Sequence, residues 1–488
     1  MEISTAAHTA STRSVSSRSR DDHRSPVNAR EAMNCLPLAL VAFSLALLLG
    51  QGSPAAAADG DLPRKGYLGV RLATPSPDVR ARQQLVGGAG VLIEAVVADT
   101  TAADGGMRPG DVLLAINGAT VRSVEEALAT IAAMTATQRV EITLVRDRQR
   151  IVLPMTLRER PRDRGDNFDV LYHHVVSRAA RIRTIVTRPR AAGRHPVLFL
   201  IKGVGPGSLD EPLSGPEPYS RILHEFAKSG YVTVRVDKPG VGDSEGGPFA
   251  DVDFDTELDA YRQAMAAVRS YTFVDVDKIF MFGHSMGGVF APIVASEVPT
   301  KGIAVYGTVS KTWTEYFLEN WRRQATLAAD DPARIDAMLR DLAAALHLLL
   351  VEQKPPDEVL RVRPDLRSIL AKLAPAGLIN GRSIRFWSQL VTKNLPAYWT
   401  KGHPDVLAMW GRHDFIATEA DHPFIAEIVN KIHLGKGTYV SLDDSDHAFR
   451  KTASLADSFK RWSAPGGEFN PSILATLRGW IEKVQLSE

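Results

Sequence analysis

The residue pattern with the clearest chemical meaning is Gly283-His-Ser-Met-Gly287, a serine flanked at two positions by glycines. The apolar run 279–282 precedes it and the apolar stretch 289–294 follows, which indicates a strand, a sharp turn and a helix. So tight a turn requires residues without bulk at Gly283 and Gly287, and it exposes Ser285 at the edge of a sheet. We therefore predict that Ser285 is a nucleophile. The alternative is that the pattern marks only a tight turn.

A serine hydroxyl needs a histidine to accept its proton and a carboxylate to hold that imidazole in the right tautomer. Asp414 follows the apolar run 406–410 almost directly, and His447 comes later, within Asp443-Asp-Ser-Asp-His447. We predict that Asp414 and His447 act with Ser285, because an acid beside its own histidine in sequence usually points elsewhere. The competing candidates are His413, His422, Asp443, Asp444 and Asp446.

Acyl transfer also needs hydrogen-bond donors for the oxyanion that develops on the attacked carbonyl. The backbone N–H of Met286, directly after the serine, is one predicted donor. The Gly-rich segment 200–207, which follows a strand-like run, resembles the oxyanion loop of α/β-hydrolases, and this resemblance implies the backbone N–H of Val204 as the second donor. The alternative for this segment is a plain Gly/Pro turn.

The histidines show no metal-ligand spacing of the HExxH kind, so the sequence predicts neither a metal nor another cofactor. His284 is interpreted as a structural residue of the turn.

Apolar strand-like runs alternate with helical patterns through the C-terminal part of the chain. This alternation predicts an α/β fold whose mostly parallel sheet is covered by helices on both faces. The expected strands are 182–186, 197–201, 232–236, 279–282, 303–306 and 406–410.

A long insertion with helical periodicity, about 311–403, separates the last two of these strands. Inserted there, it would form a helical cap over the carboxyl ends of the strands, where ligands bind. Its aromatic residues could line a substrate pocket, but a small lid more often uses such residues for its own core. They are Trp313, Tyr316, Phe317, Phe386, Trp387, Tyr398 and Trp399.

The preceding region has short β-type runs separated by turn signals, with a single helix at 124–134 behind Ser123 as its N-cap. The expected strands are 67–72, 90–97, 111–116, 140–145 and 151–157.

The segment 105–118, together with Tyr67-Leu-Gly-Val70, closely resembles the PDZ family, particularly its bacterial envelope members. The resemblance implies that the loop Tyr67, Leu68, Gly69 and Val70 presents backbone N–H groups to a peptide carboxylate, beside a sheet edge that accepts an added strand. A spacer or lid that binds nothing is the alternative.

The motifs around Ser285, Asp414 and His447, with Asp237-Lys-Pro-Gly-Val-Gly-Asp-Ser244, resemble the α/β-hydrolase superfamily over about 197–480. The chain order nucleophile, acid, histidine is the one that this superfamily implies, and the phrase before the serine is similar to the branch of acyl-peptide hydrolases and related esterases. Lys202 departs from the family pattern, because it stands where relatives carry a histidine before the oxyanion donor.

The first 58 residues form a Ser/Thr/Arg-rich leader, the apolar stretch 36–49 and an alanine-rich segment, which is the layout of a signal peptide. We expect cleavage near Ala58 and a periplasmic or secreted protein without a permanent membrane span. An uncleaved anchor is the alternative. The only cysteine, Cys35, would be removed, so the mature chain would have no disulfide. The formal charge of +2 excludes the strongly basic surface typical of nucleic-acid binding.

The predicted organisation is leader and signal peptide 1–58, PDZ-like domain 64–158, linker 159–167 and α/β-hydrolase domain 168–488. The predicted activity is hydrolysis of a small carboxylic ester through an acyl-enzyme, with a protein C-terminus as a candidate ligand of the PDZ-like domain. A serine peptidase or aminopeptidase of the same fold is one alternative, although no acidic pair that would anchor a peptide amine is evident. A non-catalytic peptide-binding scaffold is the other.

Overall fold

The computed structural model describes residues 58–59, 62–85, 87–213, 215–402, 404–462, 464 and 466–486. All of these belong to one compact unit, residues 52–488. The predicted leader therefore lies outside the described residues except for Ala58. With Asp59 it forms β1 (Ala58–Asp59), which pairs with the strand that opens the C-terminal domain.

A six-stranded antiparallel sheet with three short helices makes up a β-rich module, residues 66–159. Its strands lie in the order β3-β4-β5-β7-β8, with β6 paired to β5, so β3 is an edge strand. The elements are β3 (Val70–Ala73), α1 (Pro77–Arg82), β4 (Val91–Val96), α2 (Thr101–Asp104), β5 (Val112–Ile116), β6 (Ala119–Thr120), α3 (Val124–Ala132), β7 (Arg139–Arg146) and β8 (Gln149–Thr156).

Alternation of side chains builds the core of this module. Val140, Ile142 and Leu144 are buried at every second position of β7 and belong to one cluster with Ala127 of α3. Ser123 caps α3 as expected, since its side chain accepts a hydrogen bond from the backbone N–H three residues on.

The two ends of the module pair with each other, as β2 (Gly66–Tyr67) and β9 (Arg158–Glu159). The expected single strand at 67–72 is therefore wrong: Gly69 has φ +80°, and this left-handed residue separates β2 from β3. The start of the predicted linker, Glu159, is likewise part of a paired strand.

The C-terminal α/β domain is built on a sheet of nine strands in the order β1-β10-β11-β13-β12-β14-β15-β18-β19. The hairpin β10–β11 is antiparallel and joins β13 antiparallel, whereas every pair from β13 to β19 is parallel. The strands are β10 (Phe168–Ser177), β11 (Ala180–Pro189), β12 (His195–Ile201), β13 (Val232–Val236), β14 (Val274–His284), β15 (Gly302–Tyr306), β18 (Asp405–Gly411) and β19 (Gly437–Leu442).

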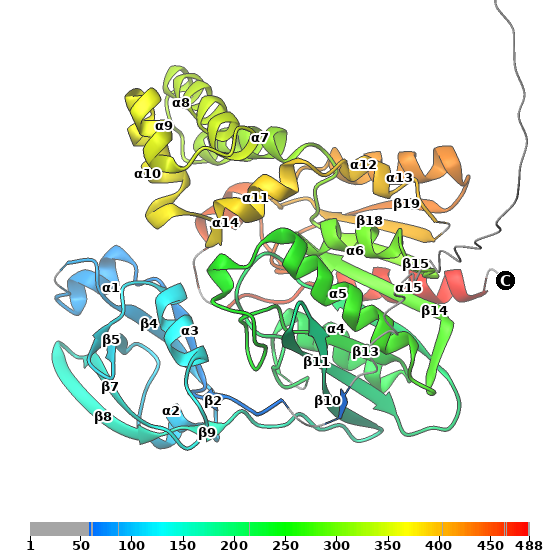
Figure 1. Ribbon diagram of the computed structural model, residues 1–488, viewed down its shortest axis with the longest axis horizontal. Helices are drawn as coiled ribbons and strands as arrows, with labels where there is room; N and C mark the ends of the chain where they lie inside the picture. The colour runs from blue at the N-terminus through cyan, green and yellow to red at the C-terminus, as the bar shows by residue number, and fades with distance from the viewer. Residues whose placement is uncertain are drawn as a thin grey trace, which may run out of the picture. The chain divides into compact units, whose positions relative to one another are not determined.

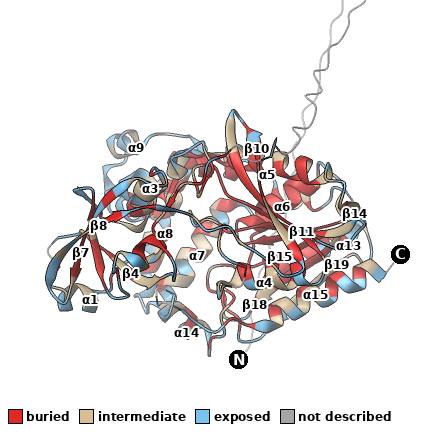
Figure 2. Ribbon diagram, turned by 90° about the horizontal axis from the view of Figure 1, so that it is seen from below, coloured by how far each residue is buried: buried red, intermediate tan, exposed pale blue. Residues whose placement is uncertain are grey.

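Helices cover both faces of this sheet (Figure 1). One face packs on α4 (Pro218–Lys228) and α15 (Pro471–Leu486), and the other on α5 (Phe254–Arg269), α6 (Gly287–Ala295) and α13 (Asp421–Ile432). Successive residues of β12 alternate between the two cores: Phe199 belongs to one and Leu200 to the other, both fully buried. Figure 2 shows the central strands as buried between partly exposed helices. The near-continuous apolar runs in the sequence follow from this double burial.

The insertion between β15 and β18 is helical, as predicted. On α8, the residues Ile335, Leu339, Leu342 and Leu346 are buried on one face. Its elements are α7 (Trp313–Leu327), α8 (Pro332–Leu346), a π turn (His347–Val351), α9 (Pro356–Val362), α10 (Arg367–Leu373), the pair β16 (Leu378–Ile379) and β17 (Arg382–Ser383), α11 (Ile384–Val391) and α12 (Leu395–Tyr398).

The sequence missed three strands of the large sheet, the two-residue β1 and the longer β10 and β19. β19 at its edge is only partly buried and has no apolar run, and β10 is interrupted by Asp169 and two histidines. The six expected strands are all present, several of them one to five residues longer at an end.

Candidate active site

Ser285 lies at the turn between β14 and α6 in a left-handed conformation, with φ +53°. Its backbone N–H donates to Tyr306 O (2.9 Å), and its carbonyl accepts from Thr308 Oγ1 (3.1 Å). A non-glycine residue with this φ costs free energy, so neighbouring contacts must hold it. The turn is therefore tied to the end of β15, the adjacent strand.

The two glycines of the motif are required by close backbone approach. A Cβ on Gly283 would lie 2.5 Å from Gly287 O, and a Cβ on Gly287 would lie 1.9 Å from Ile201 O. Any side chain at these positions would push β14, α6 and β12 apart.

His447 and Asp414 form a direct pair. His447 Nδ1 lies 2.7 Å from Asp414 Oδ2, and Asp414 is 1% exposed. The other carboxylate oxygen of Asp414 accepts the backbone N–H groups of Ile416 and Ala417, each at 2.8 Å. A carboxylate held in this way orients the imidazole and leaves Nε2 as a base.

The turn after β15 lies against both the serine and the histidine–aspartate pair. A Cβ on Gly307 would stand 2.9 Å from both Asp414 Oδ2 and His447 Nδ1, while Thr308, the next residue, binds the carbonyl of Ser285. Within the described residues the serine hydroxyl is not bonded to His447, whose ring bonds to Asp414. In unliganded sites this hydrogen bond is often long, and it tightens when substrate binds.

The competing histidines and aspartates are engaged elsewhere. His413 Nδ1 lies 2.8 Å from Thr452 O, and His422 Nε2 accepts the backbone N–H of Thr308 at 3.1 Å. Asp446 binds Arg450 through both its side-chain and its backbone N–H groups, and Asp443 lies 3.2 Å from Arg412 on the surface.

The backbone N–H groups of Met286 and Val204 are both available as donors, since neither bonds to another described residue. Gly203 lies against the nucleophile turn: a Cβ on it would be 3.3 Å from Ser285 Cβ and 3.7 Å from Ser285 Oγ. The segment 202–207 thus passes beside the serine.

His284 connects this segment to His447. Its Nε2 lies 2.9 Å from His447 O, and because a carbonyl only accepts, Nε2 carries the proton. Its Nδ1 then accepts from the Tyr219 hydroxyl at 2.5 Å, whose oxygen in turn accepts the N–H of Gly203 at 3.3 Å. Burial first, and then the nearby His447, hold the pKa of His284 well below its usual range. Sequence reasoning had no signal for Tyr219 or Gly307.

The cap aromatic residues pack mainly on one another. Trp313 stacks on Trp387 at 5.7 Å between ring centroids, Phe317 meets Trp387 edge-on at 5.3 Å, and Phe386 is fully buried. Tyr316 and Tyr398 are only partly buried. The cap's own core accounts for most of the set.

In the β-rich module, the four predicted loop residues have different surroundings. The Tyr67 ring packs under the Arg160 guanidinium (4.4 Å), and burial raises its pKa to about 12. Leu68 is buried in the core, Gly69 is left-handed, and Val70 begins the edge strand β3. The N–H groups of Leu68 and Gly69 bond to no other described residue.

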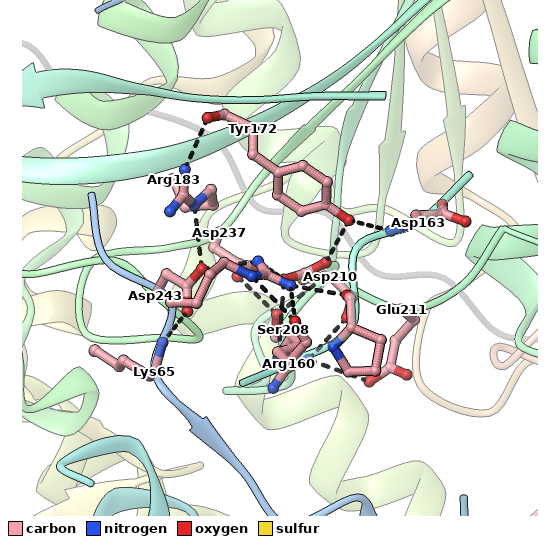
Figure 3. Close-up of polar contacts among 12 residues, drawn as sticks. Lys65, Arg160, Asp163, Tyr172, Arg183, Ser208, Asp210, Glu211, Asp237 and Asp243 are labelled. Carbon is pink, nitrogen blue, oxygen red and sulfur yellow. Dashed lines mark hydrogen bonds and ion pairs between the residues drawn. The ribbon is translucent and has the colours of Figure 1, made fainter. Parts of the chain in front are cut away.

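Residues that flank this module bind the α/β domain through a buried polar cluster (Figure 3). Arg64 forms ion pairs with Asp210 and with Asp243, and its Nη1 lies 2.8 Å from Asp243 Oδ2. The backbone N–H of Lys65 donates to Asp243 at 2.9 Å. Arg160 donates to the carbonyl of Asp210 at 2.8 Å. Asp210 lies six residues after Val204, in the same connection between β12 and α4.

Within the residues that the structure describes, no cluster of metal-ligating side chains is present. No helix in that part of the chain has the length and apolar character needed to cross a bilayer.

Two family models match the chain. Residues 217–355 match the family described as "Serine aminopeptidase, S33", and residues 92–146 match the PDZ domain family.

Among curated proteins, Esterase EstD from Thermotoga maritima is 21% identical over 180 residues, which cover 37% of this chain and 41% of the esterase. The magnetosome formation protease MamE from Paramagnetospirillum magneticum is 39% identical over 84 residues, 17% of this chain and 12% of the protease. The chain therefore matches less than half the length of either relative.

Among solved structures, the complex of DcsB with its substrate analogue covers 65% of this chain and 98% of its own, at 15% identity and a TM-score of 0.40. Est1E from Butyrivibrio proteoclasticus with bound ferulic acid covers 59% and 96%, at 15% identity and a TM-score of 0.37. An HtrA-type protease with a decapeptide covers 20% of this chain and 30% of its own, at 28% identity and a TM-score of 0.20.

The structure and the two family matches indicate the same fold. The nine-stranded sheet with Ser285 at a left-handed turn agrees with the match at residues 217–355, and the N-terminal module with its edge strand β3 agrees with the match at residues 92–146. The chain has an α/β-hydrolase fold, preceded by a PDZ domain at residues 92–146.

Proposed function

We propose that this protein is a serine hydrolase that cleaves a carboxylic ester through an acyl-enzyme. Ser285 attacks the carbonyl while His447 takes its proton, and Asp414 holds the imidazole and stabilises its charged form. The N–H groups of Met286 and Val204 receive the developing oxyanion. His447 then returns the proton to the leaving alcohol, and water repeats the sequence to release the acid.

One observation carries this proposal. Ser285 is held at φ +53° on a turn that is hydrogen-bonded to residues 306–308. These residues also pack on the His447–Asp414 pair, at Gly307. A single short connection after β15 thus supports both the nucleophile and its candidate base.

The test is labelling with a fluorophosphonate probe, together with turnover of p-nitrophenyl acetate and longer esters. We expect wild type to label and turn over, and Ser285→Ala to do neither. Ser296→Ala, which changes a partly buried serine at the end of α6, is the matched control and should behave as wild type. Equal labelling of wild type and Ser285→Ala would refute the assignment, and a wild type that does neither would favour the non-catalytic scaffold.

Cleavage of an N-terminal residue from peptides is the second candidate, favoured by the description of the family model that matches residues 217–355. Aminoacyl p-nitroanilides distinguish the two reactions. A kcat/KM for an anilide that exceeds that for every ester tested would make the protein a peptidase.

For the PDZ domain we propose binding of a peptide C-terminus. The edge strand β3 lacks a partner on one side among the described strands, and the free N–H groups of Leu68 and Gly69 precede it. An added strand on such an edge, with its carboxylate in the loop, is a recurrent mode of recognition. Fluorescence anisotropy with labelled peptide pools tests this, and amidation of the C-terminus should abolish binding. Equal binding of acid and amide would point to a spacer role.

Export is proposed from the leader sequence. Fractionation of cells expressing the full chain, with N-terminal sequencing of the product, should find a periplasmic or secreted protein that begins near Asp59. A full-length membrane-bound product would indicate an anchor instead.

A further inference from the structure

A buried lysine holds the loop that contains Val204. Lys238 lies two residues after the end of β13, is 1% exposed, and donates from Nζ to Gly203 O at 2.5 Å. Residue Gly203 immediately precedes the candidate oxyanion donor and packs on Ser285.

The surroundings of Lys238 are charged as well as buried. Glu257 of α5 lies 3.0 Å from its Nζ and also pairs with Arg382 of β17 at 2.6 Å. The Tyr261 hydroxyl donates to the same carboxylate at 3.2 Å. One buried carboxylate thus faces two buried cations. Burying these charges costs free energy unless the hydrogen bonds and the geometry of the ion pairs offset the loss of hydration.

The geometry of a trans peptide converts this contact into an orientation. The C=O of Gly203 and the N–H of Val204 belong to one planar unit and point in opposite directions. With the carbonyl bound to Lys238, the N–H of Val204 must point away from Lys238. The N–H of Gly203 is taken by the Tyr219 hydroxyl, so it is not the donor. Both peptide groups around Gly203 are therefore fixed.

We propose that Lys238 is a positioning residue for the oxyanion hole: by holding Gly203 O, it directs the N–H of Val204 toward the carbonyl attacked by Ser285. This rests on the proposed function. A cation on the carbonyl also polarises the shared amide, which makes its N–H a stronger donor. The ion pairs through Glu257 to Arg382 connect the cap insertion to the same peptide.

The decisive comparison is Lys238→Met against Arg235→Met. Arg235 is the matched control because it is equally buried, lies on the strand that precedes Lys238, and donates to carbonyls of the same connection farther on, at Leu209 and Glu211. Both variants lose a buried cation. Only Lys238→Met releases the Gly203–Val204 peptide.

For each variant we would measure kcat, KM and the inhibition constant of a trifluoromethyl ketone, whose adduct with the serine carries an oxyanion. Loss of one oxyanion donor lowers kcat by about 10²–10³-fold in other hydrolases. We expect Lys238→Met to lower kcat about 10–100-fold and to weaken the ketone by a similar factor, with KM nearly unchanged. In Arg235→Met, any loss of kcat should be smaller, and the inhibition constant of the ketone should not change in parallel with it.

Two results separate this proposal from the proposed function. If wild type is active but Lys238→Met matches Arg235→Met in all three constants, or changes KM alone, the positioning role is wrong while the esterase assignment stands. If wild type neither labels at Ser285 nor turns over esters, the proposed function itself fails.

Should Lys238→Met not fold, Glu257→Gln gives a second test. Burial lowers the pKa of Lys238 to about 7. The negative charge of Glu257 opposes this shift, whereas the positive charges of Arg382 and Lys202 add to it. Removing the charge of Glu257 should lower this pKa further, so the alkaline decline of kcat should move to lower pH than in wild type. Superimposable pH–kcat profiles would overturn the proposal, because a purely structural lysine would not shift them.

Discussion

The PDZ domain and the hydrolase domain differ in what they bury. Among the described residues of the PDZ module, 66–159, the one buried ionisable side chain is Asp111, which pairs with Arg146 at 2.7 Å near the surface. The hydrolase domain buries many such groups, several of them in the loops around the nucleophile turn. They include Asp237, Lys238, Glu257, His284, Arg382, Asp414, His422 and His447.

Buried charges are costly unless they are paired and hydrogen-bonded, and an apolar replacement of the same volume is often as stable. Among its described residues, the PDZ module 66–159 carries this cost only at Asp111. We therefore expect that the buried charges of the hydrolase domain position peptide groups and side chains. Four experiments test this difference between the two domains.

The largest expected difference is between two aspartates that are both 1% exposed, Asp414 and Asp111. Asp414→Asn should lower kcat about 10⁴-fold, because the amide can favour the wrong imidazole tautomer. Asp111→Asn should leave kcat for p-nitrophenyl esters within about twofold while loosening the PDZ domain. Similar kcat values for both variants would remove Asp414 from the mechanism.

The second contrast concerns stability within the hydrolase domain. Glu257→Ala leaves Lys238 and Arg382 buried without a counterion, so urea unfolding should show a loss of about 3–5 kcal/mol. Its control is Glu297→Ala, which breaks the exposed pair with Arg262 and should cost less than about 1 kcal/mol. Equal losses would mean that the buried cluster is solvated.

Acid should destabilise the hydrolase domain selectively. Burial lowers the pKa of His422, which is neutral in the fold because its Nε2 accepts from Thr308 N. Below pH about 6.5 the unfolded chain then binds more protons than the native one, so the free energy of unfolding falls by up to about 1.4 kcal/mol per pH unit for this histidine. His284 contributes with the same sign.

Residues 64–158 contain no histidine, so the PDZ domain supplies an internal reference. Hydrogen exchange at pH 7.5 and 5.5 should show an acid-induced loss of protection around His422. In the PDZ sheet, histidine protonation should cause no loss of protection. His422→Gln should reduce the pH slope, and an unchanged slope would exclude this histidine as the cause.

The smallest effect is expected from a single methylene in the PDZ core. Ile142→Val, at a fully buried position of β7, should cost about 0.5–1.5 kcal/mol. Hydrogen exchange should show the loss in the PDZ sheet, with kcat unchanged. A fall in kcat would show that the packing of the PDZ core affects the active site. The activity would then depend on both domains and not on the hydrolase domain alone.

Several features were predictable from the sequence because their causes are local. Double burial of the parallel strands produces apolar runs such as 232–236, and the steric limits of the nucleophile turn produce the glycines around Ser285. The PDZ match also rests on a short contiguous segment. By contrast, β19 is a partly buried edge strand with no apolar run, and the left-handed Gly69 interrupts what reads as one strand.

The sequence by itself thus determined the fold class, the two domains and the candidate residues Ser285, Asp414 and His447. Only the tertiary structure decided which carboxylate meets His447, because the pair is 33 residues apart and its competitors are nearer in sequence. The roles of Tyr219, Gly307 and Lys238 also emerged only there. Tyr219 and Lys238 act through backbone groups of Gly203, and a contact to backbone requires no particular residue type at the partner position. Gly307 acts by leaving room for the side chains of Asp414 and His447, which are distant in sequence.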